Sequence, residues 1–443
     1  MYFEEEVQYL LSLGHETLAI KLGLRNTELL LHALEYPQHA FPAVQIAGTN
    51  GKGSAAAMLD SICRAAGINC GLYTSPHLVS ITERIKLAGI EITPAEFARS
   101  ATRVRDVSEK LLAGKKIEAL PTFFEQLTAI ALDAFRNAGI ELAILETGLG
   151  GRLDATTAAE AQIVAITQIA LDHQEYLGQT LESIASEKAA IIHADVDAVI
   201  ARQSPEALAV LLKRCEETGV TPILDDLCRK VVRATEGGKF CVTFETAAGC
   251  YEDVVLGMRG RHQIDNAAVA IRLAEVLRVR GLAVPQAAIV NGLETVQHPG
   301  RLELIPHEPA FLLDGAHNPA GCQSLREYLD EFATRPLTLV FGAMRDKQLD
   351  QIGELLFPQA DILILTPIEN PRSAATELLR SVASRFARGT VVESSSSSEA
   401  LDLAIEKTPL GGLICVTGSL YLIGELRPSI LRKSLVQNHD YAT

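Results

Sequence analysis

The sequence predicts an α/β protein that has a mainly parallel sheet in its N-terminal part and a second, smaller α/β domain. Short apolar runs alternate with amphipathic helical patterns along most of the 443 residues. A glycine-rich turn follows the apolar run 43–47, and the alternation restarts after a Pro/Gly hinge at 296–301. Short buried strands separated by helices are typical of parallel sheets covered on both faces.

The N-terminal elements follow from this alternation. The predicted strands cover residues 43–47, 70–74, 142–146, 163–168 and 196–201, and the predicted helices cover 54–66, 94–113, 122–137, 180–191 and 205–217. Residues 229–256 break the rhythm and predict a hairpin, which we expect to form an antiparallel edge of the first domain. A helix over 263–280 follows.

The hinge divides the chain into two expected domains, residues 1–296 and 297–443. In the second domain, strands are predicted at 310–314, 337–342, 361–366, 389–393 and 412–417, with helices at 319–332, 347–355, 375–387, 397–406 and 420–427.

Composition narrows the class of protein. Apolar residues make up 48 % and charged residues 21 %, and the net charge of −15 disfavours a nucleic-acid partner held by bulk charge. The eight cysteines form no Cys-x-x-Cys pair, so zinc ribbons and redox dithiols have no support. The acidic N-terminus is unlike a signal peptide, and no apolar run approaches a membrane span. We therefore expect a cytoplasmic enzyme without a membrane partner.

A phosphate-binding loop is the strongest motif. It consists of Gly48, Thr49, Asn50, Gly51, Lys52, Gly53 and Ser54. Between a strand and a helix, glycines let backbone N–H groups surround phosphate oxygens, and the helix N-terminus adds its positive dipole end. Lys52 supplies a mobile cation and Ser54 a hydroxyl near magnesium. Ile46 replaces the usual first glycine and Gly53 separates lysine from hydroxyl. The alternative is a glycine-rich turn with an exposed lysine.

Polar residues follow other strands where ligands bind in open α/β sheets. Glu146 ends a buried strand beside the phosphate loop, which favours a magnesium ligand over a cap of the next turn. His173 lies beyond the next strand, and the alternative is an ordinary surface or core histidine. Ser75 either reaches magnesium or forms a turn before Pro76.

Lys188 lies in a nearly apolar helix. An apolar setting lowers a lysine's pKa, and the neutral amine can be modified chemically, whereas the alternative is an exposed lysine paired with Glu187. In the second domain, Asp314 and His317 follow a strand and precede a helix that Asn318 can cap.

The order of motifs resembles that of folylpolyglutamate synthase and dihydrofolate synthase, within the Mur ligase superfamily. The motifs are the phosphate loop, Thr74–Leu78, Glu146–Thr156, Leu171–His173, Glu187–Ala189, Gly260–Ala268, Pro299–Arg301, Asp314–Pro319, Gly342–Lys347 and Gly418–Tyr421. The resemblance covers nearly the whole chain. It implies a Mur-ligase-like ATP-binding domain and a Rossmann-like C-terminal domain that acts on glutamate.

The resemblance implies an ATP-dependent amide ligase. Such enzymes phosphorylate a substrate carboxylate, and the amine of L-glutamate then attacks the acyl phosphate to give an amide, ADP and phosphate. The expected substrates are ATP, L-glutamate, and dihydropteroate or a folate. Cations are needed to offset the developing charge, which Lys52 and two Mg²⁺ ions can supply. A monomer is expected.

Site residues are carried over by position. Ser75 and Glu146 resemble ligands of the first magnesium, and Glu146 and His173 ligands of the second. Lys188 matches a family lysine that reacts with carbon dioxide to form a carbamate.

Further positions match nucleotide and substrate contacts. Gln263 and Asn266 match the adenine-side motif, Arg301 a phosphate-binding arginine and Asp314 a nucleotide contact. His317 and Ser419 resemble residues near the incoming glutamate. The expected catalytic residues are Lys52, His173, Lys188, Asp314 and His317.

Four residues resemble the segment that binds the pterin in enzymes that act on dihydropteroate: Thr122, Phe124, Asp154 and Ala155. Phe124 either stacks on the flat ring or is a core aromatic on a helix face.

Two other functions remain open. One is a Mur-type ligase that acts on another carboxylate, against which stands the short stretch of about 40 residues before the phosphate loop. The other is a non-catalytic ATP-binding regulator, against which stands the set Lys52, Glu146, His173 and Lys188.

Overall fold

The computed structural model describes residues 2–14, 23–235 and 237–440. These residues divide into two compact units, and neither unit is a continuous stretch of chain. Unit 1 comprises residues 1–228, 244–251 and 265–296, and unit 2 comprises residues 229–243, 252–264 and 297–443. The expected division into domains after residue 296 stays a prediction, because the compactness of a unit does not show which residues function together.

Unit 1 is built on an eight-stranded sheet in the order β4-β3-β2-β5-β1-β6-β7-β8. Its strands are β1 (Ala43–Ala47), β2 (Cys70–Tyr73), β3 (Ile85–Leu87), β4 (Ile90–Glu91), β5 (Leu142–Glu146), β6 (Ile163–Ile166), β7 (Asp197–Ile200) and β8 (Ile223–Leu224). β2, β5, β1, β6, β7 and β8 are parallel to one another, whereas β3 pairs antiparallel with both β2 and β4 at one edge. The mainly parallel sheet predicted for this part of the chain is confirmed.

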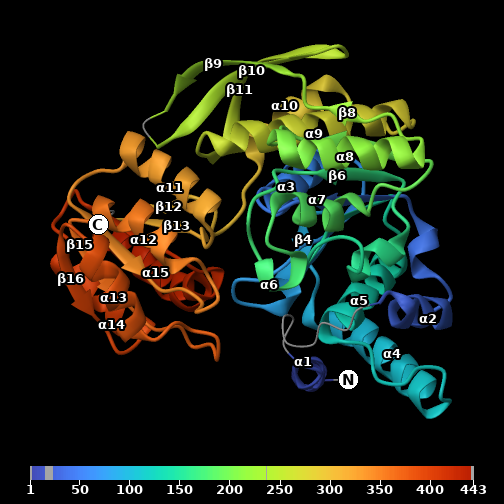
Figure 1. The fold of residues 1–443 in the computed structure, drawn as a ribbon, viewed down its shortest axis with the longest axis horizontal. Helices are drawn as coiled ribbons and strands as arrows, with labels where there is room; N and C mark the ends of the chain where they lie inside the picture. The colour runs from blue at the N-terminus through green and yellow to red at the C-terminus, as the bar shows by residue number, and fades with distance from the viewer. Residues whose placement is uncertain (1, 15–22, 236, 441–443) are drawn as a thin grey trace. The chain divides into compact units, whose positions relative to one another are not determined.

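Helices cover this sheet (Figure 1). They are α1 (Phe3–Ser12), α2 (Arg25–Ala33), α3 (Lys52–Ala65), α4 (Pro94–Ala113), α5 (Phe123–Ala138), α6 (Gln174–Leu177), α7 (Leu181–Ala189), α8 (Pro205–Thr218) and α10 (Gln286–Thr295), with 3-10 turns at Pro37–Ala40, Ile81–Arg84 and Ala155–Ala159. Helix α9 (His262–Val279) lies mostly in this unit.

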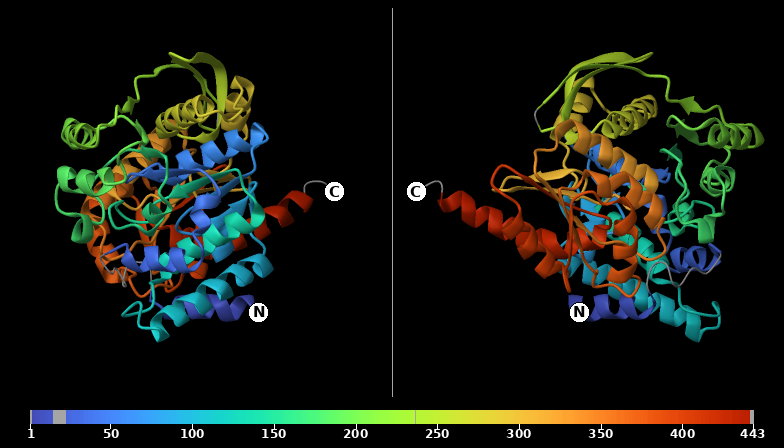
Figure 2. Two further views of the ribbon diagram at one scale, coloured as in Figure 1. Left: turned by 90° about the vertical axis from the view of Figure 1, so that its right-hand side faces the viewer. Right: turned by 60° about the vertical axis from the view of Figure 1, so that its left-hand side comes forward.

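The hairpin was expected to be an edge of the large sheet, and this expectation is wrong. Strands β9 (Cys228–Ala234), β10 (Lys239–Thr246) and β11 (Gly249–Arg259) form a separate three-stranded sheet in the order β11-β10-β9 (Figures 1 and 2). The antiparallel edge of the large sheet is instead supplied by β3 and β4. Local alternation predicts that strands pair, but it does not determine which sheet they join.

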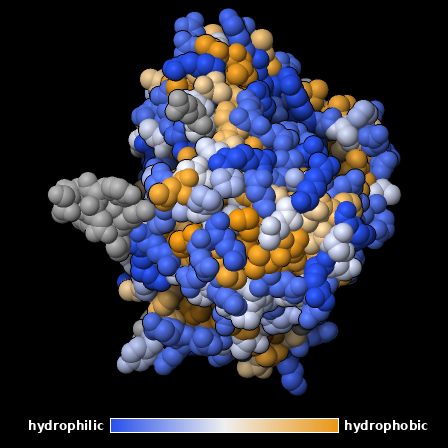
Figure 3. Space-filling view, turned by 90° about the vertical axis from the view of Figure 1, so that its left-hand side faces the viewer, coloured by the Kyte–Doolittle hydropathy of each residue, from blue (hydrophilic) through white to orange (hydrophobic). Residues whose placement is uncertain are grey.

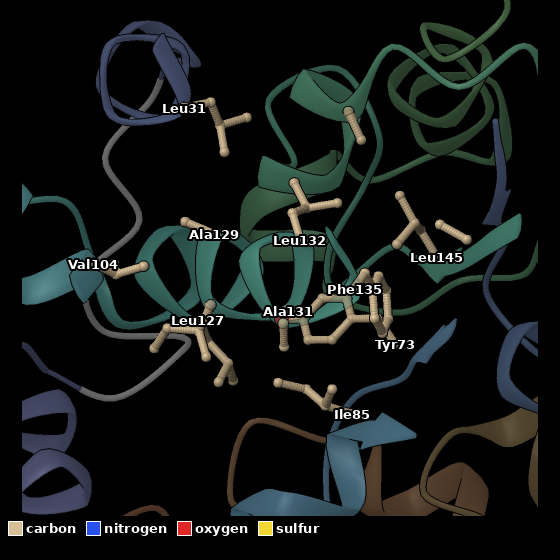
Figure 4. Packing of buried hydrophobic residues seen from close by; sticks show 14 of the residues in the cluster. Leu31, Tyr73, Ile85, Val104, Leu127, Ala129, Ala131, Leu132, Phe135 and Leu145 are labelled. Atoms are coloured by element: carbon tan, nitrogen blue, oxygen red, sulfur yellow. The ribbon is translucent and has the colours of Figure 1, made fainter. Parts of the chain in front are cut away.

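Helix α5 shows why the sequence folds as it does. The Thr122 side chain caps its N-terminus and Glu125 bonds back to the Thr122 N–H, while Gly139 ends the helix at a φ of 62°. Its buried face packs on the sheet, and Figure 4 shows Leu132 and Phe135 gathered near Tyr73 of β2 and Leu145 of β5. This aliphatic and aromatic core fixes the ends of β2 and β5.

Unit 2 contains a six-stranded sheet in the order β12-β13-β17-β14-β15-β16. The strands are β12 (Glu303–Ile305), β13 (Ala310–Asp314), β14 (Leu337–Phe341), β15 (Ile362–Leu365), β16 (Thr390–Glu393) and β17 (Leu413–Thr417). Only β12 pairs antiparallel. The helices are α11 (Pro319–Phe332), α12 (Leu349–Leu356), α13 (Thr376–Phe386), α14 (Ser397–Lys407) and α15 (Leu420–Asp440), with a 3-10 turn at Phe357–Gln359. The predicted second α/β region is confirmed, and α15 is longer than expected (Figure 2).

Apolar side chains also reach the surface. On the face drawn in Figure 3, hydrophobic patches are set among hydrophilic residues, which is ordinary for a folded chain and identifies no site by itself. None of the helices in the described residues combines the length and apolar character that crossing a membrane requires.

Candidate active site

The candidate site in unit 1 lies at the carboxyl ends of three adjacent strands. β1 pairs with β5 on one side and with β6 on the other, and all three are parallel. The segments after these strands therefore leave the sheet at the same edge. They are the phosphate loop after β1, the turn that begins at Thr147 after β5, and the segment 167–173 after β6.

The phosphate loop requires glycine at two positions. Gly48 has a φ of +150°, and a Cβ there would collide with the side chain of Thr167. Gly51 has a φ of +86°, and a Cβ there would collide with Asn266 of α9. Helix α3 begins directly after Gly51, so its first backbone N–H groups lie at the loop, where an anion is favoured.

Two backbone groups of the loop are already engaged. The N–H groups of Thr49 and Asn50 both donate to the carbonyl of Gln168, at 2.9 and 3.2 Å. The Lys52 ammonium donates to the Thr49 carbonyl at 3.2 Å. Gly53 and Ser54 lie in the first turn of α3, at the positive end of the helix dipole, where a phosphate is favoured.

Lys188 is buried against the phosphate loop. Its Nζ donates to the Gly48 carbonyl at 2.7 Å, across 140 positions of sequence. Burial, together with the positive charge of Lys52, lowers the pKa of Lys188 to about 7, although Asp172 and Asp154 act in the opposite direction. A large fraction of this amine is therefore neutral near pH 7.

The expected metal ligands come from neighbouring loops. Glu146 is buried at the end of β5, and its carboxylate accepts a hydrogen bond from the Ser75 backbone N–H at 3.2 Å. His173 has a φ of 49°, and its N–H donates to the Asp172 carboxylate at 2.9 Å. Sequence reasoning did not propose Asp172 as a site residue, although Asp172 is buried beside His173.

The side chains expected to bind magnesium offer few charged ligands. The described residues contain no group of three or more His, Cys, Asp or Glu side chains suited to a metal. The expected set contains one carboxylate (Glu146), one imidazole (His173) and the hydroxyls of Ser54 and Ser75. Carboxylate and hydroxyl oxygens suit Mg²⁺, which keeps several waters and takes phosphate oxygens from a nucleotide, so these residues fit a magnesium nucleotide rather than a protein-only cage.

The expected pterin-side residues have different local roles. Thr122 caps α5, and the buried Asp154 accepts hydrogen bonds from the N–H groups of Leu149 and Thr156 at 2.8 and 3.0 Å. Burial raises the pKa of the Asp154 carboxyl.

Two further residues of this segment lie nearby. Ala155 is buried next to Asp154. The half-buried Phe124 packs directly on Gly148, where a Cβ would strike its ring, and its ring centroid lies 6.0 Å from that of Tyr73. Its partial exposure leaves both interpretations of Phe124 open.

Unit 2 has its own group of polar residues at the carboxyl ends of β13 and β17. The buried Asp314 accepts from the N–H groups of Leu302 and Ala316 at 2.9 and 3.0 Å. Burial raises the pKa of Asp314, and the charge of Arg301 opposes this shift. The imidazole Nδ1 of His317 lies 2.8 Å from the Gly315 carbonyl oxygen.

Three further residues of unit 2 have partners of their own. Asn318 accepts from the Gly321 N–H and caps α11, as predicted. The Ser419 hydroxyl accepts from the Tyr421 N–H at 3.1 Å. Gln263, at the start of α9, lies with its Nε2 3.1 Å from Nε2 of His262.

His262 was missed by sequence reasoning. It is half-buried, and desolvation together with the charge of Arg301 lowers its pKa to about 4. It is therefore neutral at pH 7.

Comparisons with known proteins agree with this geometry. Residues 46–274 match the Mur ligase middle domain, and residues 300–420 match the Mur ligase glutamate ligase domain. The chain is 34 % identical over 426 residues to the dihydrofolate synthase/folylpolyglutamate synthase of Bacillus subtilis, covering 94 % of this chain and 96 % of that protein. Against the bifunctional folylpolyglutamate synthase/dihydropteroate synthase of Haloferax volcanii it is 34 % identical, covering 99 % of this chain but spanning only about half, 52 %, of that relative's length.

Solved structures give the same result. Folylpolyglutamate synthase of Mycobacterium tuberculosis, complexed with ADP, superimposes with a TM-score of 0.89 at 32 % identity, covering 97 % of this chain and 98 % of that one. FolC of E. coli, in complex with DHPP and ADP, gives 0.86 at 29 % identity and covers 98 % of both chains. The chain belongs to the folylpolyglutamate synthase/dihydrofolate synthase family of Mur ligases.

Proposed function

We propose that this protein is an ATP-dependent ligase that joins L-glutamate to dihydropteroate, to the γ-carboxylate of a folate, or to both. The product amide forms through an acyl phosphate, with release of ADP and phosphate. The observation that carries the proposal is the meeting of the phosphate loop, Glu146 and the buried Lys188 at one edge of the unit 1 sheet. The related structures in complex with ADP, and with DHPP and ADP, support this assignment.

The nucleotide-binding role falls to the first expected domain, residues 1–296. The loop Gly48–Ser54 and the N-terminus of α3 receive the phosphates, and Lys52 stabilises the charge that develops as the terminal phosphoryl group leaves. Asn266, which lies against Gly51, and Gln263 take the adenine side. Two residues of the second expected domain are proposed to assist: Arg301 as a phosphate contact and Asp314 as a nucleotide contact.

Magnesium would be held by Ser75 and Glu146 at one position and by Glu146 and His173 at a second, with Ser54 close to the phosphates. When bound there, Mg²⁺ would neutralise phosphate charge and orient its oxygens. The Ser75 N–H already orients the Glu146 carboxylate, so the protein holds this group in place before any nucleotide arrives.

Lys188 is proposed to become a carbamate. Its neutral amine, favoured by a pKa of about 7, attacks carbon dioxide, so that an N–C bond forms and one proton leaves the nitrogen. The new anionic oxygens would lie close to the phosphate loop, because the amine already touches the Gly48 carbonyl.

The substrates are assigned to the remaining positions. The pterin ring is proposed to stack on Phe124, with the segment held by Thr122, Asp154 and Ala155 shaping its site. L-glutamate is assigned to the second expected domain, residues 297–443, near His317 and Ser419. Closing water out of this site would protect the acyl phosphate from hydrolysis.

The test is a side-by-side assay with dihydropteroate and with tetrahydrofolate as acceptors, following incorporation of labelled L-glutamate and release of phosphate. Phosphate release is expected only when ATP, L-glutamate and one of these acceptors are all present. Turnover with UDP-linked peptides and none with pterins would instead favour another Mur-type ligase. Nucleotide binding without turnover on any acceptor would favour a regulator.

We also propose a monomer that works in the cytoplasm. Sedimentation velocity of the purified chain is expected to give one species near 47.7 kDa.

A further inference from the structure

The segment that joins β6 to α6 is held against the phosphate loop by several hydrogen bonds. The Gln168 carbonyl accepts from the N–H groups of Thr49 and Asn50. The Thr49 hydroxyl donates to the Ala170 carbonyl at 3.0 Å and accepts from the Ala170 N–H at 3.1 Å. The loop that receives phosphate and the segment that leads to His173 are therefore fastened together through residues 168–170.

A glutamine that follows the next strand also bonds to this segment. Gln203 lies between β7 and α8, and its amide Nε2 donates to the Thr167 carbonyl at 2.9 Å. Its Oε1 accepts from the Ile169 N–H at 3.0 Å. The two polar ends of one side chain thus bond to the residues on either side of Gln168, the residue on which the phosphate loop rests.

The position of Thr167 also matters for the loop. Its hydroxyl donates to the Ala47 carbonyl at 3.2 Å, and its side chain occupies the space into which a Cβ at Gly48 would project. A shift of Thr167 would therefore be felt at Gly48, whose carbonyl holds Lys188. Because packed loops transmit small displacements to the groups they touch, the Gln203 amide can control the geometry of the site without touching a ligand.

We propose that Gln203 is a positioning residue for the nucleotide: it fixes residues 167–169 so that the phosphate loop and the segment bearing Asp172 and His173 keep one relative placement. The inference rests on the proposed nucleotide site. Gln203 belongs to none of the sequence motifs, and this positioning role is inferred from its two hydrogen bonds.

The experiment measures binding of ADP with MgCl₂ by titration calorimetry, together with the KM values for ATP and for L-glutamate. Gln203→Leu removes both hydrogen bonds and is expected to raise the Kd for ADP about tenfold and to raise the KM for ATP, while the KM for L-glutamate stays unchanged. Arg202→Leu is the matched control, because Arg202 is the exposed neighbour, and its Kd is expected to stay within twofold of the parent.

A double-mutant cycle tests the route of the effect. Thr49→Val removes the hydroxyl that bonds Ala170, so its effect and that of Gln203→Leu act on one segment. The double variant is expected to lose less ADP affinity than the product of the two single losses. Full multiplication of the two effects would overturn the proposal, as would an unchanged Kd in Gln203→Leu.

Folding and function are kept distinguishable. If Gln203→Leu does not fold, Gln203→Asn keeps an amide that is one methylene too short to reach both partners, and the same rise in Kd is expected. A parent protein that binds ADP but incorporates no glutamate would remove the proposed reaction and leave this inference standing. A parent that is an active ligase, with a Gln203→Leu variant of unchanged affinity, would remove the inference alone.

Discussion

Both units bury carboxyl groups near the carboxyl ends of their sheets, but unit 1 also buries an amine there. That amine is Lys188, held by a backbone carbonyl, and the same unit buries the carboxyls of Glu146, Asp154 and Asp172. The corresponding group of unit 2 is a carboxyl, Asp314, held by two backbone N–H groups, with the half-buried His262 nearby. In both units burial favours the neutral form, so the pKa of the lysine falls and that of the aspartate rises.

The difference separates a group that can react covalently, the Lys188 amine, from a group that holds the backbone in place, the Asp314 carboxyl. A neutral lysine amine is a nucleophile, so unit 1 gains a group open to covalent change. An aspartate whose oxygens already accept from Leu302 and Ala316 is committed to holding the backbone just before β12 and just after β13. We therefore expect substitutions in unit 1 to affect chemistry first, and substitutions at Asp314 to affect stability as well.

The largest expected effect is at Lys188. Lys188→Ala is expected to lower glutamate incorporation by ~100-fold or more, since it removes the amine beside the phosphate loop and with it the proposed carbamate. Added short carboxylates such as acetate are expected to restore part of the activity by occupying the space of the carbamate. Full activity of Lys188→Ala without added carboxylate would show that the reaction needs no carbamate at this position.

Asp314→Asn gives the corresponding test in unit 2. An amide offers one acceptor oxygen where the carboxylate offers two, so one of the N–H groups of Leu302 and Ala316 loses its partner. The free energy of unfolding in urea is expected to fall by about 1–3 kcal/mol. Asp350→Asn, which breaks an exposed pair with Arg385, is the control and is expected to cost under about 1 kcal/mol. Equal losses in the two variants would contradict the structural role of Asp314.

Gly48→Ala sharpens the picture of the loop that holds Lys188. A methyl group there would collide with Thr167, so ADP affinity is expected to fall about tenfold in calorimetric titration. Gly67→Ala is the matched control: Gly67 also has a positive φ, +79°, but nothing lies within 4 Å of the added Cβ. Should both variants lose affinity alike, backbone strain rather than the collision would be the cause.

The last test is a pH dependence that separates the units. The folded-state pKa of Lys188, about 7, is below its ordinary value of 10.5, so its contribution to stability is complete above pH 10.5 and is lost as the pH falls to 7. The pKa of His262 is lowered from 6.5 to about 4, so its contribution is complete above pH 6.5 and is lost as the pH falls to 4.

Each group therefore adds a slope of at most about 1.4 kcal/mol per pH unit in its own window. Urea unfolding of the parent, of Lys188→Met and of His262→Gln across pH 4 to 10 measures both slopes. Each variant is expected to flatten the curve in one window only, and a curve that is flat in the parent would refute the assignment.

Much of this arrangement could be predicted from the sequence. Strands β1, β5 and β13 lie where their apolar runs predict them, because each run is short, buried and followed by a polar turn. The burial of Lys188 follows from the apolar residues around it in α7. Its partner Gly48 could not be predicted, because 140 residues separate them and only the order of strands brings them together.

Other features have no local signal. Gln203 lies outside every motif, and Asp172 and His262 lie within the motifs Leu171–His173 and Gly260–Ala268 without a role that the sequence assigned to them. Their roles come from neighbours in the folded chain. The hairpin was identified as strands, but its sheet was misassigned, since pairing partners depend on contacts that the alternation of residues does not encode.

The interleaved course of the chain has a practical consequence. Residues 229–243 and 252–264 belong to unit 2, although they precede the hinge. Within that unit, Phe240 packs on Phe332 of α11, and Arg261 pairs with Glu331. A gene fragment that encodes only residues 297–443 would therefore lack residues that pack on α11 and would expose that helix. Isolating unit 2 requires joining separate segments of the chain rather than making a single truncation.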